Sequence, residues 1–564
     1  MRLSTLDLIV FAAYALMIVI MGNLVSRGKK GEQKTSKDYF LAGNTLTWWA
    51  VGASLIAANI SAEQFIGMSG SGFAIGLAIA SYEWMAALTL IIVGKFFLPI
   101  FIEKKLFTIP EFVEQRFSKN LKTILAVFWI ALFVFVNLTT VLHLGAKALD
   151  TIMGMGDGKI YMYAIIGLSV FAAAYSIWGG LSAVAWTDVV QVVLLIFGGL
   201  VTTYFALMEV SGGQGIIVGF QKIYSIVPEK FSMILSPGEI TDPNGRDAFN
   251  DLPGWQVLIG GMWVANLYYW GFNQYIIQRT LASKSLKEAQ KGIIFAGFLK
   301  LLIPLIVVIP GIIAYVLHAD AEGTLIKSSL SGAFIHEGNV INDNAAPWLI
   351  NAFVPTGLKG LVLAALAAAI VSSLASMLNS TSTIFTMDIY KPYLNKNANE
   401  GQMVMVGRIT AGVALVIAVM IAPLLNSLGQ VFQYIQEYTG VVSPGILAVF
   451  MMGLFWKKAT NKGAITGVLA SIPIAMYFKV GPNGWLAGTG MESLFVSIPF
   501  MTQMLLTFLL TVLTIVLFSQ PNAEEIDNPK GITLSKETFK TDSSFNIGAI
   551  VICVILVVLY AVFF

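Results

Sequence analysis

Apolar runs of about twenty residues follow one another along the whole chain, separated by short polar stretches. A helix of about 20 apolar residues spans the hydrocarbon core of a bilayer. The pattern therefore predicts an all-α polytopic membrane protein, without a soluble domain and with about fourteen transmembrane helices. We place the spans at residues 6–26, 45–66, 73–102, 121–150, 158–178, 186–209, 254–280, 290–317, 357–388, 405–425, 428–455, 460–480, 493–518 and 544–563.

Lysine and arginine gather in alternate loops, which the positive-inside rule assigns to the cytoplasm. These loops lie at residues 27–37, 104–122, 279–291, 391–408 and 457–462. If every span crosses the membrane, the loops share one side, and an even number of spans places both termini outside. The loops 210–253 and 318–356 are less basic and rich in Asn, Asp, Gly and Pro, as outside loops often are. We expect the polar stretch 519–543 to be a cytoplasmic connector.

The second and seventh predicted spans each carry a polar cluster in the middle of the membrane. The clusters are LIAANISAEQ at 55–64 and WVANLYYWGFNQ at 263–274. Because these spans are five apart, two sets of five helices would have opposite membrane orientation, as in inverted-repeat transporters. The predicted units are a first helix with its basic loop at 1–43, a first repeat at 44–210, an outside loop at 211–253, a second repeat at 254–456 and three C-terminal helices at 457–564.

Composition agrees with a membrane protein. The chain has 564 residues, of which 57% are hydrophobic and 12% are charged, and its mean hydropathy is +0.79. A soluble protein carries roughly 25% charged residues. The formal net charge of +3, without a long basic run, gives no indication of nucleic-acid binding, and the single Cys553 excludes an internal disulfide. Basic residues follow the first apolar run, so we interpret this run as a retained helix and not as a signal peptide.

Four polar side chains fall within six positions of the second span: Asn59, Ser61, Glu63 and Gln64. Close packing of small residues is one explanation of the neighbouring glycines and alanines. It does not explain a carboxylate and an amide at this depth, where ionisable groups are costly and usually mark a ligand or ion path. An unwound helix, whose carbonyls bind a cation and whose amides bind a solute, is the alternative that we favour.

Two opposite charges lie equally deep in other spans. Glu83 in SYEWMAALTL and Lys300 in GFLKLLIPL are flanked by apolar residues, so they either pair with each other or bind a ligand. Asn266 and Tyr269 are three residues apart and share a helix face. An amide beside an aromatic ring suits a sugar, although aromatic residues are also enriched at membrane interfaces.

Two later spans are also polar. The run VSSLASMLNSTST contains Ser372 and Ser373, whose hydroxyls suit either close helix packing or a hard cation such as Na⁺. The run QYIQEYTGVVSPG places Gln436 ahead of Pro444, and we expect the proline to kink or break that span. The three histidines, His143, His318 and His336, are too scattered to suggest a metal cluster.

Several long motifs resemble the sodium–solute symporter family. GGLSAVAWTDVVQ at 179–191, NQYIIQRTLASKSLKEAQKG at 273–292 and the polar clusters above carry the resemblance, which covers nearly the whole chain. Within the family, the chain closely resembles the sodium/galactose symporters of bacteria and is similar to the sodium/glucose symporters of animals. The resemblance implies a five-plus-five inverted-repeat, LeuT-like core, with the first helix and the last three helices peripheral.

The resemblance also implies roles for individual residues. Sugar hydroxyls would bind to Gln64, Glu83, Asn266, Lys300 and Gln436. Tyr269 would stack on the sugar ring, with Asn59 as its hydrogen-bond partner. The outer gate would consist of Met68, Tyr82 and Phe432. Sodium would bind to the carbonyls of Ala57, Ile60 and Ala369 and to the hydroxyls of Ser372 and Ser373. Asp188 would lie on the ion's path to the cytoplasm, and a helix N-cap is its alternative role.

These observations predict Na⁺-coupled symport of a neutral hexose, galactose or glucose, across the bacterial inner membrane by alternating access. The co-transported Na⁺ is the only ion expected; we expect no cofactor, no enzymatic activity and no nucleic-acid partner. A sodium symporter for sialic acid, proline or myo-inositol is the alternative, and a homodimer stays open. Ala86 stands where sodium/galactose symporters carry a sugar-binding serine, so the preferred sugar epimer is undecided.

Overall fold

Helices make up almost the whole of the computed structural model, which describes residues 4–25, 34–153, 158, 160–330, 334–336, 338–427, 431–480, 491, 495, 498–519 and 530–564. Among these residues, twelve helical segments are long and apolar enough to cross a membrane. They include every predicted span except the second and the seventh, 45–66 and 254–280. Both of these are broken into shorter helices, so the predicted total of fourteen stays a prediction, while the all-α membrane architecture is confirmed.

The first half of the chain contains α1 to α11. Their bounds are α1 Thr5–Val25, α2 Ser36–Leu41, α3 Trp48–Asn59, α4 Ser69–Ala74, α5 Ser81–Ile92, α6 Leu98–Glu103, α7 Ile109–Arg116, α8 Lys119–Ala131, α9 Thr139–Ile152, α10 Tyr161–Gly179 and α11 Leu181–Val210. Three π-helical segments join neighbouring helices within single spans, at Glu63–Met68, Val93–Phe97 and Leu132–Leu138.

The second half begins with α12 in an extramembrane loop. Its helices are α12 Ile216–Ile226, α13 Trp255–Ile259, α14 Gly261–Phe272, α15 Gln274–Leu281, α16 Leu286–Val316, α17 Ala345–Phe353, α18 Leu358–Ile384, α19 Glu400–Ile421, α20 Val431–Phe455, α21 Asn461–Val480, α22 Phe500–Phe518 and α23 Ser543–Val562. A fourth π-helical segment, Phe385–Leu394, extends α18. The only sheet in the described residues pairs β1 Ile335–His336 with β2 Asn339–Val340 in antiparallel register.

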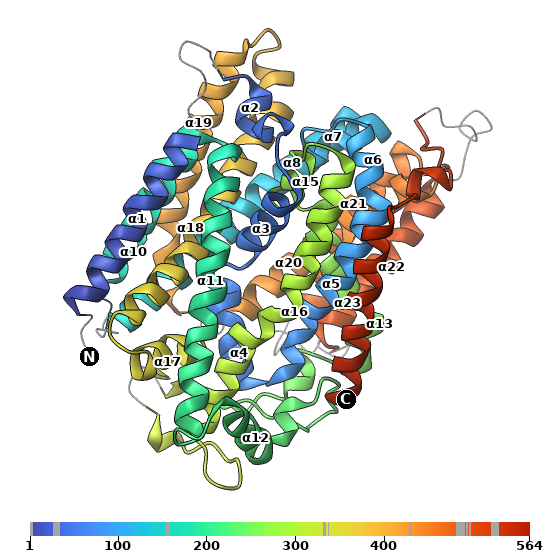
Figure 1. Cartoon of the computed structure of the whole chain (residues 1–564). Coiled ribbons are helices and arrows are strands. Elements are labelled where there is room, and N and C mark those ends of the chain that lie inside the picture. Colours follow the sequence, from blue (N-terminus) through green and yellow to red (C-terminus); the bar gives the residue numbers. More distant parts are fainter. Residues whose placement is uncertain are drawn as a thin grey trace.

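The broken helices lie at the centre of the bundle and the unbroken ones enclose them. α3 packs against α11, α16 and α18, and α14 packs against α5 and α20. In the span formed by α18 and its π-helical extension, 94% of the most apolar window is buried, against 17% for α1 and for α23. The last two therefore lie at the periphery, as Figure 1 shows for α1 and α23 at opposite sides of the molecule.

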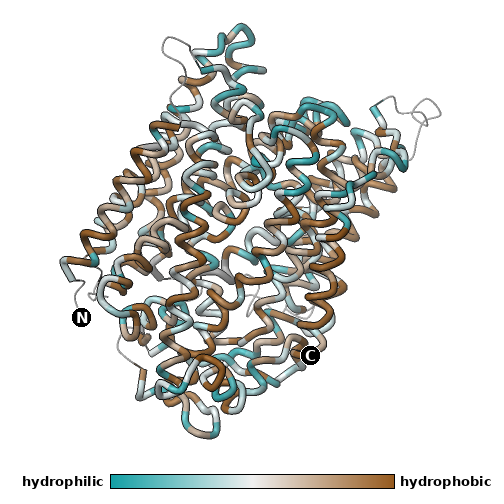
Figure 2. The backbone as a smooth tube through the Cα atoms, in the orientation of Figure 1, coloured by the Kyte–Doolittle hydropathy of each residue, from teal (hydrophilic) through white to brown (hydrophobic). Residues whose placement is uncertain are grey.

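Hydrophobic residues follow the helices and hydrophilic residues gather at the two ends of the bundle (Figure 2). The start of α1, the end of α23, α12 and α17 lie at the same end (Figure 1). This arrangement agrees with the prediction from the even number of spans, which puts both termini on the side of the loops 210–253 and 318–356. The side of the membrane that this end faces stays a prediction.

One prediction about a helix end was wrong. The second span was expected to end at residue 66, but helical structure continues to Ala74 and the chain turns at Gly76, whose φ is +105°. The neighbouring glycines permit close packing, because a Cβ at Gly72 would lie 2.5 Å from the Val308 carbonyl oxygen. Pro444 was expected to kink or break its span: it does not break it, since α20 continues from Val431 to Phe455, and a kink stays a prediction.

A candidate substrate and sodium site

The second span breaks where the sequence predicted. Ile60 has ψ +86°, and the Ser61 N–H, which an unbroken helix would donate to the Ala57 carbonyl, instead donates to Asn59 O at 2.9 Å. Two side chains accept the free backbone N–H groups where helix resumes, in an arrangement that resembles half of a capping box. Ser61 Oγ accepts from Glu63 N at 3.0 Å, and Gln64 Oε1 accepts from Ser61 N at 3.3 Å and from Ser61 Oγ at 2.9 Å. The S-x-x-Q spacing of Ser61 and Gln64 is a sequence signal of this restart.

The seventh span breaks twice. Gly260 separates α13 from α14 with φ −132° and ψ −116°, and Asn273 separates α14 from α15 with ψ +119°. These backbone angles are not helical, so peptide groups near each break lose their regular partners. In a membrane such irregular backbone is tolerated where it packs within protein or lines a cavity.

The two broken spans meet at a small cavity of about 50 Å³. Nine of the predicted sugar-site and gate residues line it: Asn59, Gln64, Met68, Tyr82, Glu83, Asn266, Tyr269, Lys300 and Gln436. The predicted outer gate residue Phe432 has a side chain outside the described residues. Residues that the sequence did not single out also line the cavity: Ala265, Tyr268, Trp270, Thr439, Ser443 and Met504. Ala86 lines it too, so the position without the family serine faces the same space.

Glu83 and Lys300 form an ion pair at this cavity. Lys300 is fully buried and Glu83 is 3% exposed. Lys300 Nζ donates to both the Glu83 carboxylate and Asn59 Oδ1, and it lies 4.9 Å from the centre of the Trp270 ring. The sequence left open whether these two charged residues pair with each other or bind a ligand. In the structure they pair at the wall of the cavity, where the Lys300 ammonium and the Glu83 carboxylate both lie beside the space that a ligand would enter.

Tyr269 is held by two neighbours. Its hydroxyl accepts from Asn59 Nδ2 at 3.0 Å and from Tyr275 Oη at 2.7 Å, which leaves its own proton to donate. On the same helix face, Asn266 Nδ2 is buried without a hydrogen-bond partner among the described residues. Buried amides normally find a partner. The amide of Asn266 is therefore a donor available to a ligand.

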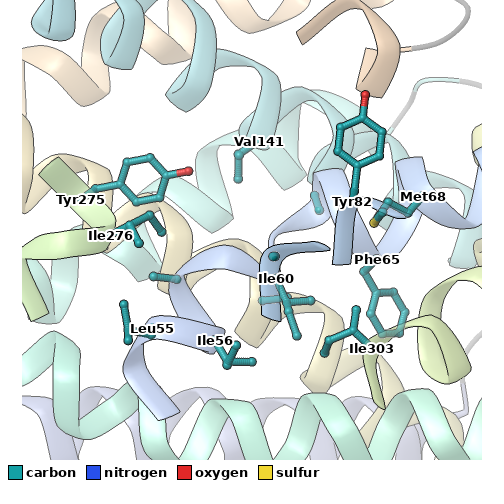
Figure 3. Packing of buried hydrophobic residues seen from close by; sticks show 14 of the residues in the cluster. Leu55, Ile56, Ile60, Phe65, Met68, Tyr82, Val141, Tyr275, Ile276 and Ile303 are labelled. Atoms are coloured by element: carbon teal, nitrogen blue, oxygen red, sulfur yellow. The ribbon is translucent and has the colours of Figure 1, made fainter. Parts of the chain in front are cut away.

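Met68 and Tyr82, two of the predicted gate residues, lie next to each other at this cavity (Figure 3). Both are buried, with Met68 fully inaccessible and Tyr82 8% exposed. A cavity of about 50 Å³ holds a water molecule or two. Binding a sugar requires movement of these walls, because ligand pockets usually enclose about 300 Å³ or more.

The predicted sodium ligands lie between α3 and α18. Ser373 Oγ donates to the Ala58 carbonyl at 3.0 Å, and Ser372 Oγ donates to Asp188 Oδ1 at 2.6 Å. Ala57, Ile60 and Ala369 are each at most 1% exposed. Both serine protons are thus directed elsewhere, so the hydroxyl lone pairs remain for a cation. An all-oxygen set of carbonyls and hydroxyls suits a hard ion such as Na⁺.

Asp188 is part of a fully buried ion pair that the sequence did not predict. It lies within α11, seven residues after the first helical residue Leu181, so the alternative role as N-cap is wrong. Arg279 Nη2 of α15 lies 3.6 Å from Asp188 Oδ2, and Arg279 Nε donates to Ser54 Oγ at 3.0 Å. Arg279 also donates to Ser376 of α18. The guanidinium therefore contacts side chains of α3, α11 and α18, and Asp188 connects it to Ser372.

Comparison with known proteins agrees with these features. The model of the sodium:solute symporter family matches residues 39–471. A "Sodium/glucose cotransporter" of Vibrio parahaemolyticus is 58% identical over 566 residues, which cover 100% of this chain and 98% of that protein. "Sodium/myo-inositol cotransporter 2" of Homo sapiens is 32% identical, with 83% of this chain and 69% of that protein covered. "Sodium/glucose cotransporter 1" of Oryctolagus cuniculus is 31% identical, with 91% and 79% covered.

Among solved structures, a Na⁺-coupled sialic acid symporter in a substrate-bound, outward-open state is similar to this chain. Its TM-score is 0.74 and its sequence identity is 23%, and the match covers 92% of this chain and 98% of that one. At this identity the likeness concerns the fold. It confirms the predicted five-plus-five, LeuT-like architecture.

Proposed function

Because the chain belongs to the sodium:solute symporter family, we propose that it carries a neutral hexose, galactose or glucose, into the cell together with Na⁺. The observation that carries the proposal is the meeting of two broken spans at one polar cavity, with Glu83, Lys300 and Asn266 in its wall. The name of the 58% identical relative supports glucose as one substrate. We propose transport and not catalysis as the activity.

The charges at the cavity favour a neutral polyol. Lys300 is neutralised by Glu83, so among the described lining residues no free cation is left for a carboxylate substrate such as sialic acid. A sugar hydroxyl both donates and accepts. It can accept from the Asn266 amide and the Tyr269 hydroxyl and donate to the Glu83 carboxylate. Myo-inositol is the second candidate, because it is also a neutral polyol and similar relatives bear its name.

Sodium would act on the broken helix. We infer that Na⁺ binds the carbonyls of Ala57 and Ile60 together with oxygens of α18, and so fixes the segment that includes Asn59. Ordering this segment prepares Asn59 to hold Lys300 and Tyr269 for the sugar. Each ligand then favours the same conformation, and the coupling must be reciprocal.

The driving force is sufficient for accumulation. One charge that crosses 100 mV releases about 2.3 kcal/mol. Because about 1.4 kcal/mol corresponds to a tenfold concentration ratio, one Na⁺ supports roughly fifty-fold accumulation from voltage alone. We place the protein in the bacterial inner membrane with both termini outside, and we keep residues 44–210 and 254–456 as the two repeats of the transport core.

The test is uptake of labelled galactose and glucose into proteoliposomes that contain the purified protein. We expect fast uptake with an inward Na⁺ gradient and little uptake with K⁺ in its place. Unlabelled myo-inositol, proline and sialic acid, added in excess, identify the preferred solute. Equal uptake with and without the gradient refutes coupling. If one of the other solutes competes more strongly than either hexose, that solute is the preferred substrate and the proposed substrate is wrong.

A further inference from the structure

Glu63 is a buried carboxylate that the proposed sugar and sodium sites do not use. It follows the break in the second span and is 6% exposed. The only hydrogen bond that its side chain forms in the described part of the chain is with Thr140 Oγ1 of α9, at 3.3 Å. No lysine or arginine of that part forms an ion pair with it. A bare charge at this depth in a membrane is costly, so a cation or a proton must neutralise it.

The contact with Thr140 does not neutralise the carboxylate. The Thr140 hydroxyl donates to the Val136 carbonyl at 2.7 Å, as threonines in helices often do. It has a single proton, so its lone pairs face Glu63. A hydroxyl that donates to a carboxylate usually lies at about 2.5–2.7 Å. At 3.3 Å, Glu63 Oε1 is the most distant of three acceptors around this hydroxyl, behind the Val136 carbonyl at 2.7 Å and the Asn137 carbonyl at 3.1 Å, so the hydroxyl is at most a weak donor to the carboxylate.

A third oxygen lies nearby in the same helical span. Asn137 precedes Thr140 by three residues, where the π-helical segment Leu132–Leu138 passes into α9, so the two residues are within about one turn of each other. Asn137 is 6% exposed, and its Oδ1 is buried without a hydrogen-bond partner among the described residues. When two oxygens bind the same hard cation, each at an oxygen–cation distance of about 2.3–2.6 Å, and the oxygen–cation–oxygen angle is about 90°, the two oxygens lie roughly 3.3–3.7 Å apart. The observed contact between Glu63 and Thr140 fits that separation.

Charged and titratable groups on the elements that pack around Glu63 are engaged with other partners. The packed elements are α4, α9, α16, α17, α20 and the turn Asn342–Asn344, and α4 and α17 carry no titratable residue. Among the groups on the other elements, the partners are Glu83 for Lys300, Asp343 for Lys147, Lys479 for Glu437, Tyr161 for His143, Asp542 for Lys287, the Trp48 amide for Glu288 and the Gly158 and Ile160 amides for Asp150. Tyr269 and Tyr275, which lie in the field of Glu63, bond to each other. None of these groups compensates the carboxylate.

We propose that Glu63, Thr140 and Asn137 form a second site for a monovalent cation, Na⁺ or H⁺, separate from the sodium site between α3 and α18. The proposal rests on the sodium-coupled transport proposed above. A cation here joins the broken span to α9 and travels with the sugar. A second charge that crosses the same voltage multiplies the sugar accumulation by another factor of roughly fifty.

The experiment counts cations per sugar in proteoliposomes. Initial fluxes of ²²Na⁺ and labelled sugar are measured together, and a trapped pH dye reports proton entry. If the site takes Na⁺, the wild-type protein moves two Na⁺ per sugar and Glu63→Gln moves one. If it takes H⁺, sugar entry acidifies the wild-type vesicles and Glu63→Gln abolishes that acidification. Thr140→Val, which removes one oxygen and keeps the shape, should raise the half-saturating concentration of the same cation about tenfold.

Asp150→Asn is the matched control. Asp150 lies on α9, as Thr140 does, and is 6% exposed, as Glu63 is. Its carboxylate oxygens, however, accept from Gly158 N and Ile160 N at 3.1 Å. The control should keep the wild-type cation count. A wild-type count of one Na⁺ without proton entry overturns the inference, and so does a Glu63→Gln protein that binds sugar with an unchanged count. If Glu63→Gln does not fold, an unchanged cation dependence of Thr140→Val overturns it. Absence of sodium-driven uptake by the wild type instead refutes the proposed function.

Discussion

Removing one member of the Glu83–Lys300 pair should be worse for the protein than removing both. Lys300 is fully buried, and its ammonium donates only to Glu83 and Asn59 in the described structure. Glu83→Gln leaves this charge without a counter-ion, and Lys300→Met leaves the carboxylate alone. Breaking a buried pair typically costs about 3–5 kcal/mol, whereas replacing both charges with groups of similar shape is often close to neutral.

Sugar binding should follow a different pattern from stability. A hydrogen bond to a charged group contributes about 1.5–3 kcal/mol, which is roughly a 10- to 150-fold change in affinity. The double variant regains stability because no unpaired charge remains. It does not regain affinity, since the carboxylate and ammonium that face the cavity are absent. The expected signature is therefore a stable protein that binds sugar weakly.

Two measurements on the purified proteins test this reasoning. Thermal unfolding in detergent, followed by size-exclusion chromatography, ranks the stability of the wild type, both single variants and the double variant. Equilibrium binding of labelled sugar gives the affinity. We expect the double variant to unfold closer to the wild type than either single variant does. If the losses of thermal stability in the two single variants add up in the double variant, the unpaired charge does not cause the damage. If the double variant binds sugar with wild-type affinity, Glu83 and Lys300 do not belong to the sugar site.

Four further substitutions test other parts of the site. Ser373→Ala should raise the half-saturating Na⁺ concentration about tenfold while sugar affinity at saturating Na⁺ changes little, because one oxygen ligand is lost; an unchanged Na⁺ dependence counts against the assigned ligand. Arg279→Gln should permit ²²Na⁺ flux without sugar, because it removes the guanidinium that pairs with Asp188 beside the proposed sodium ligand Ser372. Arg116→Gln, which removes another buried arginine, should not permit this flux. Burial lowers the pKa of Lys230, in the loop after α11, to about 7. Because the unfolded chain keeps this proton to about pH 10.5, the folded protein should become more stable as the pH rises from about 7 to 10. Lys230→Met should abolish this rise, measured as the thermal unfolding temperature. Ala86→Ser should change the ratio of galactose to glucose affinity by up to about tenfold, the value of one neutral hydrogen bond, in competition assays.

Hydropathy was enough to predict most of the spans and the break after Asn59. Asn59, Ser61 and Gln64 are too polar for a lipid-facing helix, so a cavity or a break was the physical alternative, and the structure contains both. In the seventh span the helix runs unbroken through Asn266 and Tyr269, and the breaks lie at its two ends, at Gly260 and Asn273. The end of the second span was placed too early, because only the three-dimensional packing of Gly72 against Val308 shows that the helix continues through this glycine.

Pairings between distant residues could not be predicted in the same way. Asp188 and Arg279 are 91 positions apart and lie on different helices, α11 and α15, so nothing local in the sequence connects them. The pairing of Glu83 with Lys300 was foreseen as one option because both charges lie deep in apolar spans. Arg279 gave a weaker signal, since its position near the end of a span is also compatible with a cytoplasmic loop. Composition identifies charges in the membrane, but only the fold shows which of them neutralise each other.

Coupling between the two ligands follows from how short the broken segment is. Ala57 and Ile60 would bind sodium through their carbonyls, Ser373 already holds the carbonyl of Ala58, and Asn59 contacts the sugar-site pair through its side chain. Four consecutive residues thus serve both ligands. A regular helix would direct these carbonyls along its axis to the next turn, and they could not bind an ion. The break that frees them also removes the hydrogen bonds that would otherwise keep Asn59 in place. If sodium binds as proposed, it would hold this segment in place, and the free energy of ordering Asn59 would be supplied by the ion before the sugar arrives.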